Sequence, residues 1–207
     1  MMLQGSLLDL DDRLAFGALD GLRRTTLAHG AWVDHLPGWA TGTTALFEEL
    51  LGGVDWRADK RTMYDRVVEV PRLTRFYGEH EPLPHAALVQ ARDALSAHYR
   101  DELGEAFVTA GMCLYRDARD SVAWHGDREG RASSRDTMVA ILSLGTARTL
   151  ALRERDGGAT RHRFSLGHGD LVVMGGSAQR TWDHAIPKAS GSLGPRISVQ
   201  YRTRGVR

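Results

Sequence analysis

Short apolar runs and turn-forming residues alternate through the second half of the chain. Seven segments are continuous or alternating apolar runs of strand length: 107–116, 137–145, 148–155, 161–167, 170–176, 180–186 and 196–204. Gly, Asp, Ser or Pro separates most of these runs, and "RDGGAT" at 155–160 is typical of a β-hairpin turn. This spacing predicts a β-sandwich or barrel rather than a parallel sheet.

Two segments of the first half show a helical pattern. Residues 43–52 predict a short helix that ends at Gly52 and Gly53. Residues 85–104 form the clearer pattern, and we expect Gly104 to end it. Apolar and aromatic positions recur in that segment at helical spacing: Leu88, Ala91, Leu95 and Tyr99.

Between these helices, residues 61–79 have an extended, β-branched centre. Pro71 and Gly78 follow that centre and suit a loop. We find no internal repeat and no low-complexity tract. The pattern therefore predicts a β domain over residues 106–207, with an α/β layer from residues 1–105 packed on or over it.

The composition is that of an ordinary soluble globular domain. The 207 residues are 42% apolar and 26% charged, and no apolar run approaches the length of a membrane span. The N-terminal "MMLQGSLLDLDDR" is acidic where an export signal would be basic. Cys113 is the single cysteine, which fits a reducing compartment. We expect a monomeric, cytoplasmic protein that contacts no membrane.

Charge is distributed unevenly between the two halves. Residues 1–110 carry 11 Lys and Arg against 17 Asp and Glu, whereas residues 111–207 carry 16 against 9. The second half should therefore favour anions, either a polyanion such as nucleic acid or a small acid. A mildly basic half without any specific partner is the alternative interpretation.

A possible metal-binding pair occurs in "SVAWHGDREG" at residues 121–130. On a strand, His125 and Asp127 would point to the same face, because residues two apart share a face. With a third ligand from another strand, an imidazole and a carboxylate form a facial triad that leaves three positions open. That arrangement suits non-haem Fe(II), which needs open positions for a co-substrate and dioxygen.

The H-x-D spacing is weak evidence alone, since 9 His and 17 Asp would produce it about once by chance. It occurs again at His168 and Asp170, where Asp170 suits a turn. His184 follows Asp127 by 57 residues, a separation expected where a barrel brings its second and penultimate strands together. A lone His184 would equally suit a buried core position.

Two arginines near the C-terminus suggest an anion site. Arg196 and Arg202 are six residues apart, so on a strand they share a face. Inward-facing arginines are costly unless they meet carboxylates, which they bind in a bidentate manner. The same spacing occurs at Arg155 and Arg161, so the spacing by itself decides nothing.

The order of these motifs resembles the AlkB family of Fe(II)- and 2-oxoglutarate-dependent dioxygenases, which remove alkyl groups from nucleic acid bases. The resemblance covers residues 68–204 and rests on an ordered set of motifs: Tyr115, His125-x-Asp127, "LSLG" (142–145), "HGDLVVMGG" (168–176), "WDHAIPK" (182–188) and "PRISVQYR" (195–202). It implies an α+β fold, with a double-stranded β-helix (jelly roll) and an N-terminal α/β nucleotide-recognition lid. We expect residues 1–207 to form one such domain, with the extension and lid in 1–105 and the catalytic core in 106–207.

The resemblance also assigns the cofactor and co-substrate residues. Its iron ligands are His125, Asp127 and His184. Arg196, helped by Tyr115, would clamp the distal carboxylate of 2-oxoglutarate, and Arg202 would lie at the other end of the co-substrate, near Asp127. It assigns His168 and Asp170 to a structural turn. Fe(II), 2-oxoglutarate and dioxygen are thus the expected cofactors.

For the substrate, the resemblance points to alkylated DNA or RNA. "PRLTRFYGE" (71–79) resembles a lid segment, in which Arg72 and Arg75 would contact phosphates and Tyr77 would line the base pocket. Glu129 matches a position where a carboxylate accepts a hydrogen bond from a base amino group. Residues 80–90 contain no apolar wedge for opening a duplex, which favours single strands.

Three positions in two motifs depart from the family pattern. Cys113 stands where the family has Asn, and the R-x-N-x-T-x-R motif has Ser198 and Gln200 at its middle positions. Ser198 can still donate one hydrogen bond to 2-oxoglutarate, whereas Cys113 is a poor substitute for an amide. We expect a lower co-substrate affinity or a rearranged network.

Three functions remain open from the sequence. The first is oxidative dealkylation of N-alkylated bases such as 1-methyladenine and 3-methylcytosine. The second is a 2-oxoglutarate dioxygenase of a protein or small molecule, which the acidic first 110 residues favour. The third is a catalytically silent nucleic-acid binder, against which the intact triad argues.

Overall fold

A computed structural model describes residues 13–63, 66–127 and 130–206, with side chains described outside 59–69. The larger sheet has eight strands: β2 (Arg23–Thr26), β3 (Ala31–Leu36), β12 (Leu171–Gly176), β9 (Val139–Gly145), β14 (Arg196–Arg202), β7 (Thr109–Tyr115), β6 (Arg66–Tyr77) and β5 (Arg57–Met63), in this spatial order. The smaller sheet has four: β11 (His162–Leu166), β10 (Arg148–Glu154), β13 (Trp182–Ile186) and β8 (Val122–His125). Every pairing in both sheets is antiparallel, which confirms the predicted jelly roll.

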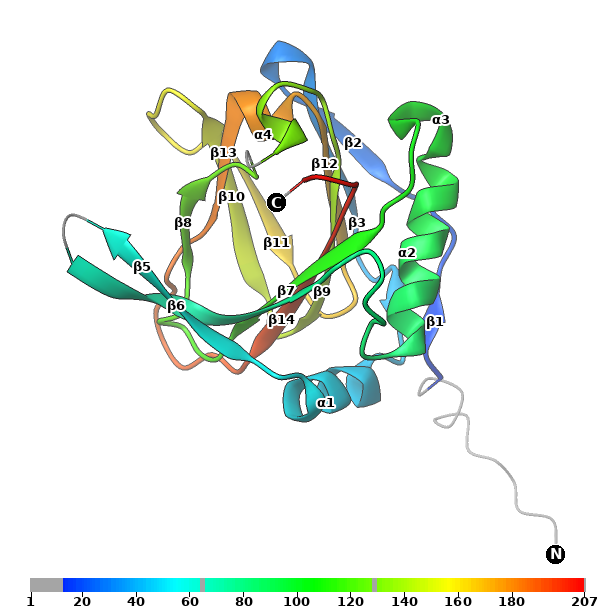
Figure 1. Ribbon diagram of the computed structural model, residues 1–207, viewed down its shortest axis with the longest axis vertical. Helices are drawn as coiled ribbons and strands as arrows, with labels where there is room; N and C mark the ends of the chain where they lie inside the picture. Colours follow the sequence, from blue (N-terminus) through cyan, green and yellow to red (C-terminus); the bar gives the residue numbers. More distant parts are fainter. Residues whose placement is uncertain (1–12, 64–65, 128–129, 207) are drawn as a thin grey trace, which may run out of the picture.

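Helices cover the outer face of the larger sheet. Figure 1 shows α1 (Thr44–Gly53) and α2 (Ala86–His98) on the side of this sheet opposite β8, β10, β11 and β13. Shorter elements complete the fold: α3 (Arg100–Leu103), α4 (Ala178–Thr181), the β1–β4 pair (Ala15–Phe16 with Ala40–Thr41), and 3-10 turns at Ala28–Gly30 and Arg131–Ser133. None of the helices among the described residues is long and apolar enough to cross a membrane.

The larger sheet separates two hydrophobic clusters. On β14, Ile197, Val199 and Tyr201 pack toward α1 and α2, while Arg196 and Ser198 face the smaller sheet. Because side chains alternate along a strand and both faces are covered, these strands read as nearly continuous apolar runs. The polar residues on the inner face of β14 therefore project into the space between the sheets.

Strands from the first half of the chain extend the larger sheet at both edges. The β2–β3 pair joins the sheet through β12, and the β5–β6 pair joins it through β7. The N-terminal half thus contributes strands to the sheet, in addition to the helices packed over it. The division at residue 105 remains a prediction.

The loop predicted at Pro71 is wrong, because β6 continues through this residue to Tyr77. The β5–β6 register shifts between Ala58 and Lys60, opposite the segment that contains Pro71. A proline has no N–H for the ladder and is tolerated at such an irregularity. Its carbonyl accepts a hydrogen bond from Ser121 N at 2.7 Å, which ties β6 to the segment entering β8.

The helix predicted over 85–104 is interrupted once. α2 ends at His98 and α3 begins at Arg100, because Tyr99 leaves the helical conformation with ψ at 8°. The Tyr99 hydroxyl donates to the buried Asp34 on β3 at 2.9 Å, so the break fixes α2 to the edge of the sheet. Gly104 ends α3 at a φ of 73°, as predicted.

Candidate metal and co-substrate site

Two neighbouring strands of the smaller sheet bring the metal-site histidines together. His125 ends β8, and His184 lies on β13 as its direct antiparallel partner. Their ring centroids are 4.2 Å apart. This pairing closes the long sequence separation between the two residues, as expected for the second and penultimate strands of a barrel.

Asp127 joins the two histidines from a loop. The expectation that it shares a strand face with His125 is wrong, because β8 ends at His125. Its backbone N donates instead to Oε1 of the buried Gln179 at 2.9 Å, which fixes the loop against α4. Asp127 Oδ1 then lies 3.8 Å from His125 Nε2, and the three ligand atoms of the triad all lie within 4.8 Å of one another.

Hydrogen bonds orient two members of the triad toward a common point. His125 Nδ1 donates to the carbonyl of Ala123 at 2.8 Å, so the lone pair of Nε2 faces the other ligands. Arg202 contacts Asp127 Oδ2 through Nε and Nη2, both at 2.7 Å, which leaves Oδ1 directed to His125.

The charges around Asp127 keep its carboxylate ionised. Burial alone would raise the pKa of Asp127. Electrostatic interactions with Arg202, His184 and His125, with the Arg202 hydrogen bond, instead lower the pKa of Asp127 well below the usual range. Burial also lowers the pKa of His125, so its imidazole is favoured in the neutral form that binds metals.

Arg196 is a buried cation without a carboxylate among the described residues. It is 1% exposed, its Nε donates to Ser143 Oγ at 2.9 Å, and its Nη1 has no hydrogen-bond partner in the described chain. Its guanidinium carbon lies 5.3 Å from the ring centre of Tyr115. Burial lowers the pKa of Arg196 and raises the pKa of Tyr115 to about 12. Such a group calls for an anionic ligand.

The positions that depart from the family pattern form a hydrogen-bonded chain. Cys113 Sγ lies 3.9 Å from Gln200 Oε1, to which the thiol donates, and Gln200 Nε2 donates to Ser198 Oγ at 2.6 Å. Arg202 Nη2 also donates to Gln200 Oε1 at 3.4 Å. The structure thus contains a rearranged network in place of the two Asn positions.

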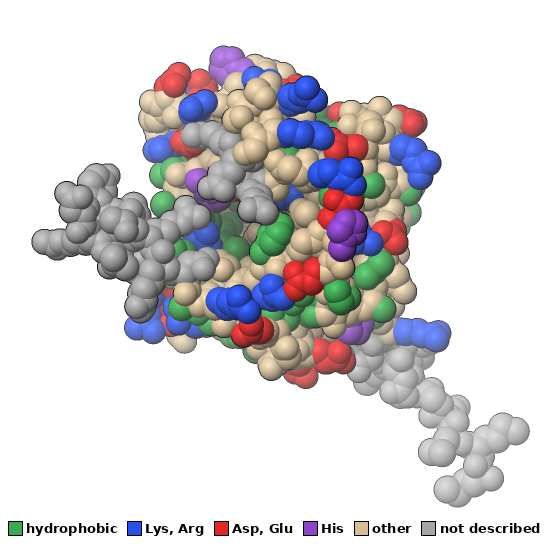
Figure 2. Space-filling model, in the orientation of Figure 1, with side chains coloured by type: hydrophobic (Ala, Val, Ile, Leu, Met, Phe, Trp, Pro, Cys, Tyr) green, Lys and Arg blue, Asp and Glu red, His purple; other side chains and the backbone are tan. Residues whose placement is uncertain are grey.

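A cavity of about 740 Å³ between the sheets contains the triad and Arg196. Tyr115, Ser198 and Arg202 line it as well, so all the residues assigned to metal and co-substrate share one space. On the face seen in Figure 2, positive and negative side chains are interspersed over the surface and do not form large patches of one sign.

The predicted substrate residues are placed less uniformly. Arg72 and Arg75 on β6 line the cavity. The ring of Tyr77 lies instead in the hydrophobic cluster on the helix side, 6% exposed, because alternation along β6 turns it away from the cavity. Phe76, 38% exposed, occupies the cavity wall in its place. Glu129 lies outside the described residues.

The second H-x-D copy is structural. His168 Nδ1 accepts from Gly145 N at 2.8 Å, and its Nε2 lies 2.7 Å from Thr43 Oγ1. Asp170 accepts from the backbone N of Gly38 and of Gly167, at 2.8 and 2.6 Å. These hydrogen bonds connect neighbouring turns. They occupy both ring nitrogens of His168 and both carboxylate oxygens of Asp170.

Several residues that shape the site were given no role by the sequence analysis, although Ser143 lies within the "LSLG" motif. Gln179 and Ser143 orient Asp127 and Arg196 through single hydrogen bonds from elements distant in sequence. Gly111 is needed because a Cβ there would come within 2.6 Å of Arg202 Nη1 and 3.1 Å of Gln200 Oε1. A glycine amid an apolar strand is the one signal that a close approach was present.

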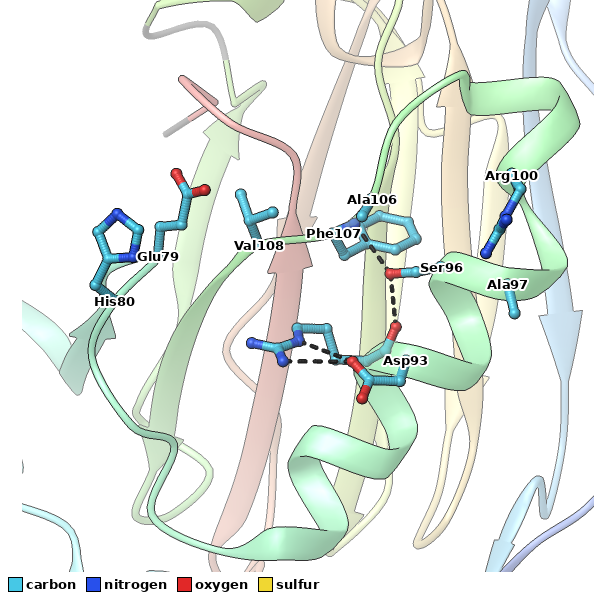
Figure 3. Close-up of a pocket in the computed structure, with 10 residues that line it drawn as sticks. Glu79, His80, Asp93, Ser96, Ala97, Arg100, Ala106, Phe107 and Val108 are labelled. Carbon is cyan, nitrogen blue, oxygen red and sulfur yellow. Dashed lines mark hydrogen bonds and ion pairs between the residues drawn. The ribbon is translucent and has the colours of Figure 1, made fainter.

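A second hollow, of about 460 Å³, lies between α2 and the segment leading into β7 (Figure 3). Its charged groups are largely paired: Glu79 with Arg204, and Asp93 with Arg92. Ser96 accepts from Phe107 N and donates to Arg92 O. The contacts are those of a helix docked on a sheet.

A family model described as the 2OG-Fe(II) oxygenase superfamily matches residues 35–203. The match includes the triad, Arg196 and Arg202. The chain belongs to the 2OG-Fe(II) oxygenase superfamily. Membership implies Fe(II), 2-oxoglutarate and dioxygen. The donor set of this oxygenase fits them, because two imidazoles and one carboxylate leave open positions on iron and Arg196 lacks a carboxylate.

Curated relatives place the oxygenase within the AlkB family, as predicted. Alpha-ketoglutarate-dependent dioxygenase alkB homolog 3 of Homo sapiens is 33% identical over 175 residues, which cover 76% of this chain and 60% of that protein. DNA oxidative demethylase ALKBH2 of Arabidopsis thaliana is 29% identical over 133 residues, 54% of this chain and 42% of that protein. The chain thus spans about 60% of the length of the alkB homolog 3 relatives.

A solved structure of OsALKBH1 shares the fold. It matches the oxygenase with a TM-score of 0.60 and 13% sequence identity, over 86% of this chain and 100% of that chain. At this identity the likeness concerns the arrangement of strands and helices. It supports the jelly roll and does not bear on the predicted lid.

Proposed function

We propose that this oxygenase oxidatively removes alkyl groups from N-alkylated bases, such as 1-methyladenine and 3-methylcytosine, in DNA or RNA. One observation carries the reaction class. The His125, Asp127 and His184 triad lines the same cavity as Arg196, whose Nη1 has no hydrogen-bond partner in the described chain. The alkB names of the relatives support the substrate class.

In the proposed reaction, each group of cavity residues has a separate role. His125, Asp127 and His184 would hold Fe(II), and the bound metal would supply the oxidising chemistry for the N-alkyl carbon, with 2-oxoglutarate and dioxygen as co-substrates. Arg202 holds the Asp127 carboxylate ionised and oriented through its two contacts to Oδ2. Arg196 neutralises the distal carboxylate of the co-substrate, a pairing strengthened by burial.

The cavity walls suit a base that has left its stack. At about 740 Å³, the space exceeds what a five-carbon diacid fills. Phe76 and Trp124 line the wall from β6 and β8, and aromatic faces stack bases regardless of sequence. After hydroxylation of the alkyl carbon, the N-hydroxyalkyl group releases an aldehyde and restores the base.

The test is a panel of oligonucleotides carrying 1-methyladenine, 3-methylcytosine or an etheno adduct, as matched single- and double-stranded DNA and RNA. With the iron-loaded full chain, we expect succinate release in step with mass loss of the modified base. We propose single strands as the preferred form. Succinate release without any base repair across the panel would instead indicate a protein or small-molecule substrate.

The duplicated H-x-D motif provides a matched control. His125→Ala should abolish coupled turnover, whereas His168→Ala should retain it and lower stability by about 1–2 kcal/mol through its lost hydrogen bonds. Equal activity in the two variants would contradict the assignment of the metal site. Affinity for the repaired strand should also fall steeply with salt, because phosphate contacts release counterions.

A further inference from the structure

The single cysteine of the chain lies inside the co-substrate cavity. Cys113 is 8% exposed, lines the cavity from the inner face of β7, and directs its Sγ toward Gln200. The surface of the described chain is otherwise free of thiols, because the sequence contains one cysteine. Any thiol chemistry of the folded protein must therefore take place in this cavity.

The pairing of β7 and β14 places Cys113 beside the anion-binding group. Tyr115 faces Arg196 across the two strands, and Cys113 faces Ser198 one step along on the same side of the sheet. One step of two residues along a strand is roughly 6.6 Å.

Arg196 indicates what kind of molecule would reach this thiol. Its Nη1 is buried, lines the cavity and has no acceptor in the described chain, so it recruits a carboxylate. A dicarboxylate of four or five carbons held there would extend along β14 toward Ser198 and Cys113, which the strand register places on the same side of the sheet. The thiol would then lie alongside the carbon chain of the bound acid.

We propose that Cys113 is a site of covalent modification by α,β-unsaturated dicarboxylates that bind Arg196. The Cys113 thiol gives its proton to solvent, and its sulfur adds to one alkene carbon, forming an S–C bond as the C=C π bond breaks. The other alkene carbon, activated by its carboxylate, takes up a proton from solvent. The net reaction adds the thiol S–H across the double bond, without an oxidant or a leaving group.

The modified protein would be inhibited by the adduct that it carries. A thioether dicarboxylate on Cys113 keeps one carboxylate on Arg196 and fills the position of the co-substrate. The proposal rests on the dicarboxylate site of the proposed function and not on its nucleic acid substrate. Because modification is read from mass, it can fail or succeed independently of any repair activity.

The experiment follows adduct formation by intact mass, with fumarate as the probe on the full chain. We expect one fumarate per chain, mapped to Cys113 by peptide mass analysis and absent in Cys113→Ser. Succinate has the same length and charge but no double bond, so succinate at about ten times its Kd should slow labelling about tenfold by occupying the dicarboxylate site.

Neutral dimethyl fumarate separates recruitment from simple thiol reactivity. It offers the same alkene without carboxylates, so succinate should protect against it only by filling the cavity. Arg196→Gln should slow labelling by fumarate about tenfold relative to labelling by the diester, because only the diacid depends on the guanidinium. Adducts in Cys113→Ser, or fumarate labelling that is unaffected by both succinate and Arg196→Gln, would overturn the proposal. If Arg196→Gln does not fold, the succinate result decides alone.

Discussion

Arg196 buries a guanidinium on the inner face of β14, where Ser143 accepts one hydrogen bond and Nη1 meets no acceptor in the described chain. Removing such a charge from water costs several kcal/mol, which neutral partners such as Ser143 and Tyr115 offset only in part. Burial lowers the pKa of Arg196 for the same reason. The residue is therefore arranged for a ligand at the expense of the stability of the free protein.

Replacing this charge should stabilise the protein while removing its co-substrate site. We expect Arg196→Met to raise the free energy of unfolding by about 1–3 kcal/mol, since the buried charge is replaced by an apolar chain of similar length. Adding 2-oxoglutarate to the Mn(II)-loaded variant should then no longer raise Tm above the value with Mn(II) alone, whereas it should raise the Tm of the Mn(II)-loaded unsubstituted protein. Denaturant unfolding and thermal melts measure both effects.

Arg148 is the matched control. It is equally buried, at 4% exposure, but donates to the carbonyls of Asp117, Asp120 and Pro187 at 2.7 to 3.1 Å. Arg148→Met should destabilise the protein, because three buried carbonyls lose their donor. Similar changes in stability from the two substitutions would contradict the view that Arg196 is held for a ligand.

At the scale of elements, the β7–β14 pair depends on a residue without a side chain. Gly111 on β7 leaves room for Arg202 and Gln200 to cross the inner face of the sheet. The nearest atoms to an added Cβ are the mobile ends of these two side chains, so a methyl group there would be accommodated by displacing them. The strand would survive, but the contact between Arg202 and Asp127 would not.

Gly111→Ala should therefore weaken metal binding more than it weakens the fold. We expect Mn(II) affinity to fall about tenfold or more, the usual effect of losing a partner that orients a metal ligand. The free energy of unfolding should change by less than about 1 kcal/mol. Isothermal titration calorimetry and denaturant unfolding give the two values.

Gly175 on β12 provides the opposite case. An added Cβ there would lie 2.1 Å from the ring of Trp32, a rigid group in the core. Gly175→Ala should lower stability by about 1–3 kcal/mol through overpacking and leave Mn(II) affinity unchanged. If both variants lost stability and metal affinity in parallel, Gly111 would have no specific role in positioning Arg202.

The short helix α4 has a comparable role on the other side of the triad. It comes just before β13, and its Gln179 accepts the hydrogen bond of Asp127 N, so one turn of helix connects the segments that carry Asp127 and His184. We expect Gln179→Leu to leave a buried N–H unsatisfied, lowering stability by about 1–3 kcal/mol and Mn(II) affinity about tenfold.

A neighbouring substitution tests whether that effect is specific. Ser177 precedes α4 and donates to the carbonyl of His29 at 2.6 Å, away from the triad. Ser177→Ala should reduce stability by a similar amount and spare metal affinity. If the two variants bound Mn(II) equally, Gln179 would have no positioning role.

Across the whole molecule, what the sequence predicted follows from periodicity, and what it missed follows from contacts between distant segments. Alternating and apolar runs located the strands, since both faces of the larger sheet are buried. The motif order assigned Arg196 and Arg202, which β14 places on one face. Tyr77 was predicted to line the base pocket, but the alternation along β6 turns Tyr77 to the helix side and Phe76 to the cavity. Which of two neighbouring aromatic residues faces inward depends on the pairing of β6 with distant strands.

Gln179 and Ser143 illustrate a second limit of the sequence. Each acts through one hydrogen bond to a residue more than fifty positions away, so only the folded chain reveals its partner. Asp127 was predicted on a strand, yet the loop that holds it reaches the same point. The chemistry of the site thus depended less on the secondary structure of Asp127 than on the groups that fix it.

Both hydrophobic clusters contain buried tyrosines, so the stability of the whole fold depends on these hydroxyls remaining protonated at high pH. Burial is the main cause that raises the pKa of Tyr115 to about 12, and it also raises the pKa values of Tyr77, Tyr99 and Tyr201. Tyr115 lies in the cluster between the sheets, while the other three lie on the helix side. Ionising any of them places a charge in one of the two clusters.

Stability should consequently decline at alkaline pH. An unfolded tyrosine ionises near pH 10, so between about pH 10 and 12 the folded chain binds more protons than the unfolded chain, and rising pH favours unfolding. The contribution of Tyr115 is fully present below about pH 10 and is lost as pH rises through its folded pKa of about 12.

Denaturant unfolding at a series of pH values should show this decline, and tyrosinate absorbance should rise in step with loss of the fold. In denaturant the same absorbance should follow the pKa of free tyrosine. Ionisation of all tyrosines near pH 10 with the fold intact would show that these hydroxyls are not buried as the two clusters require.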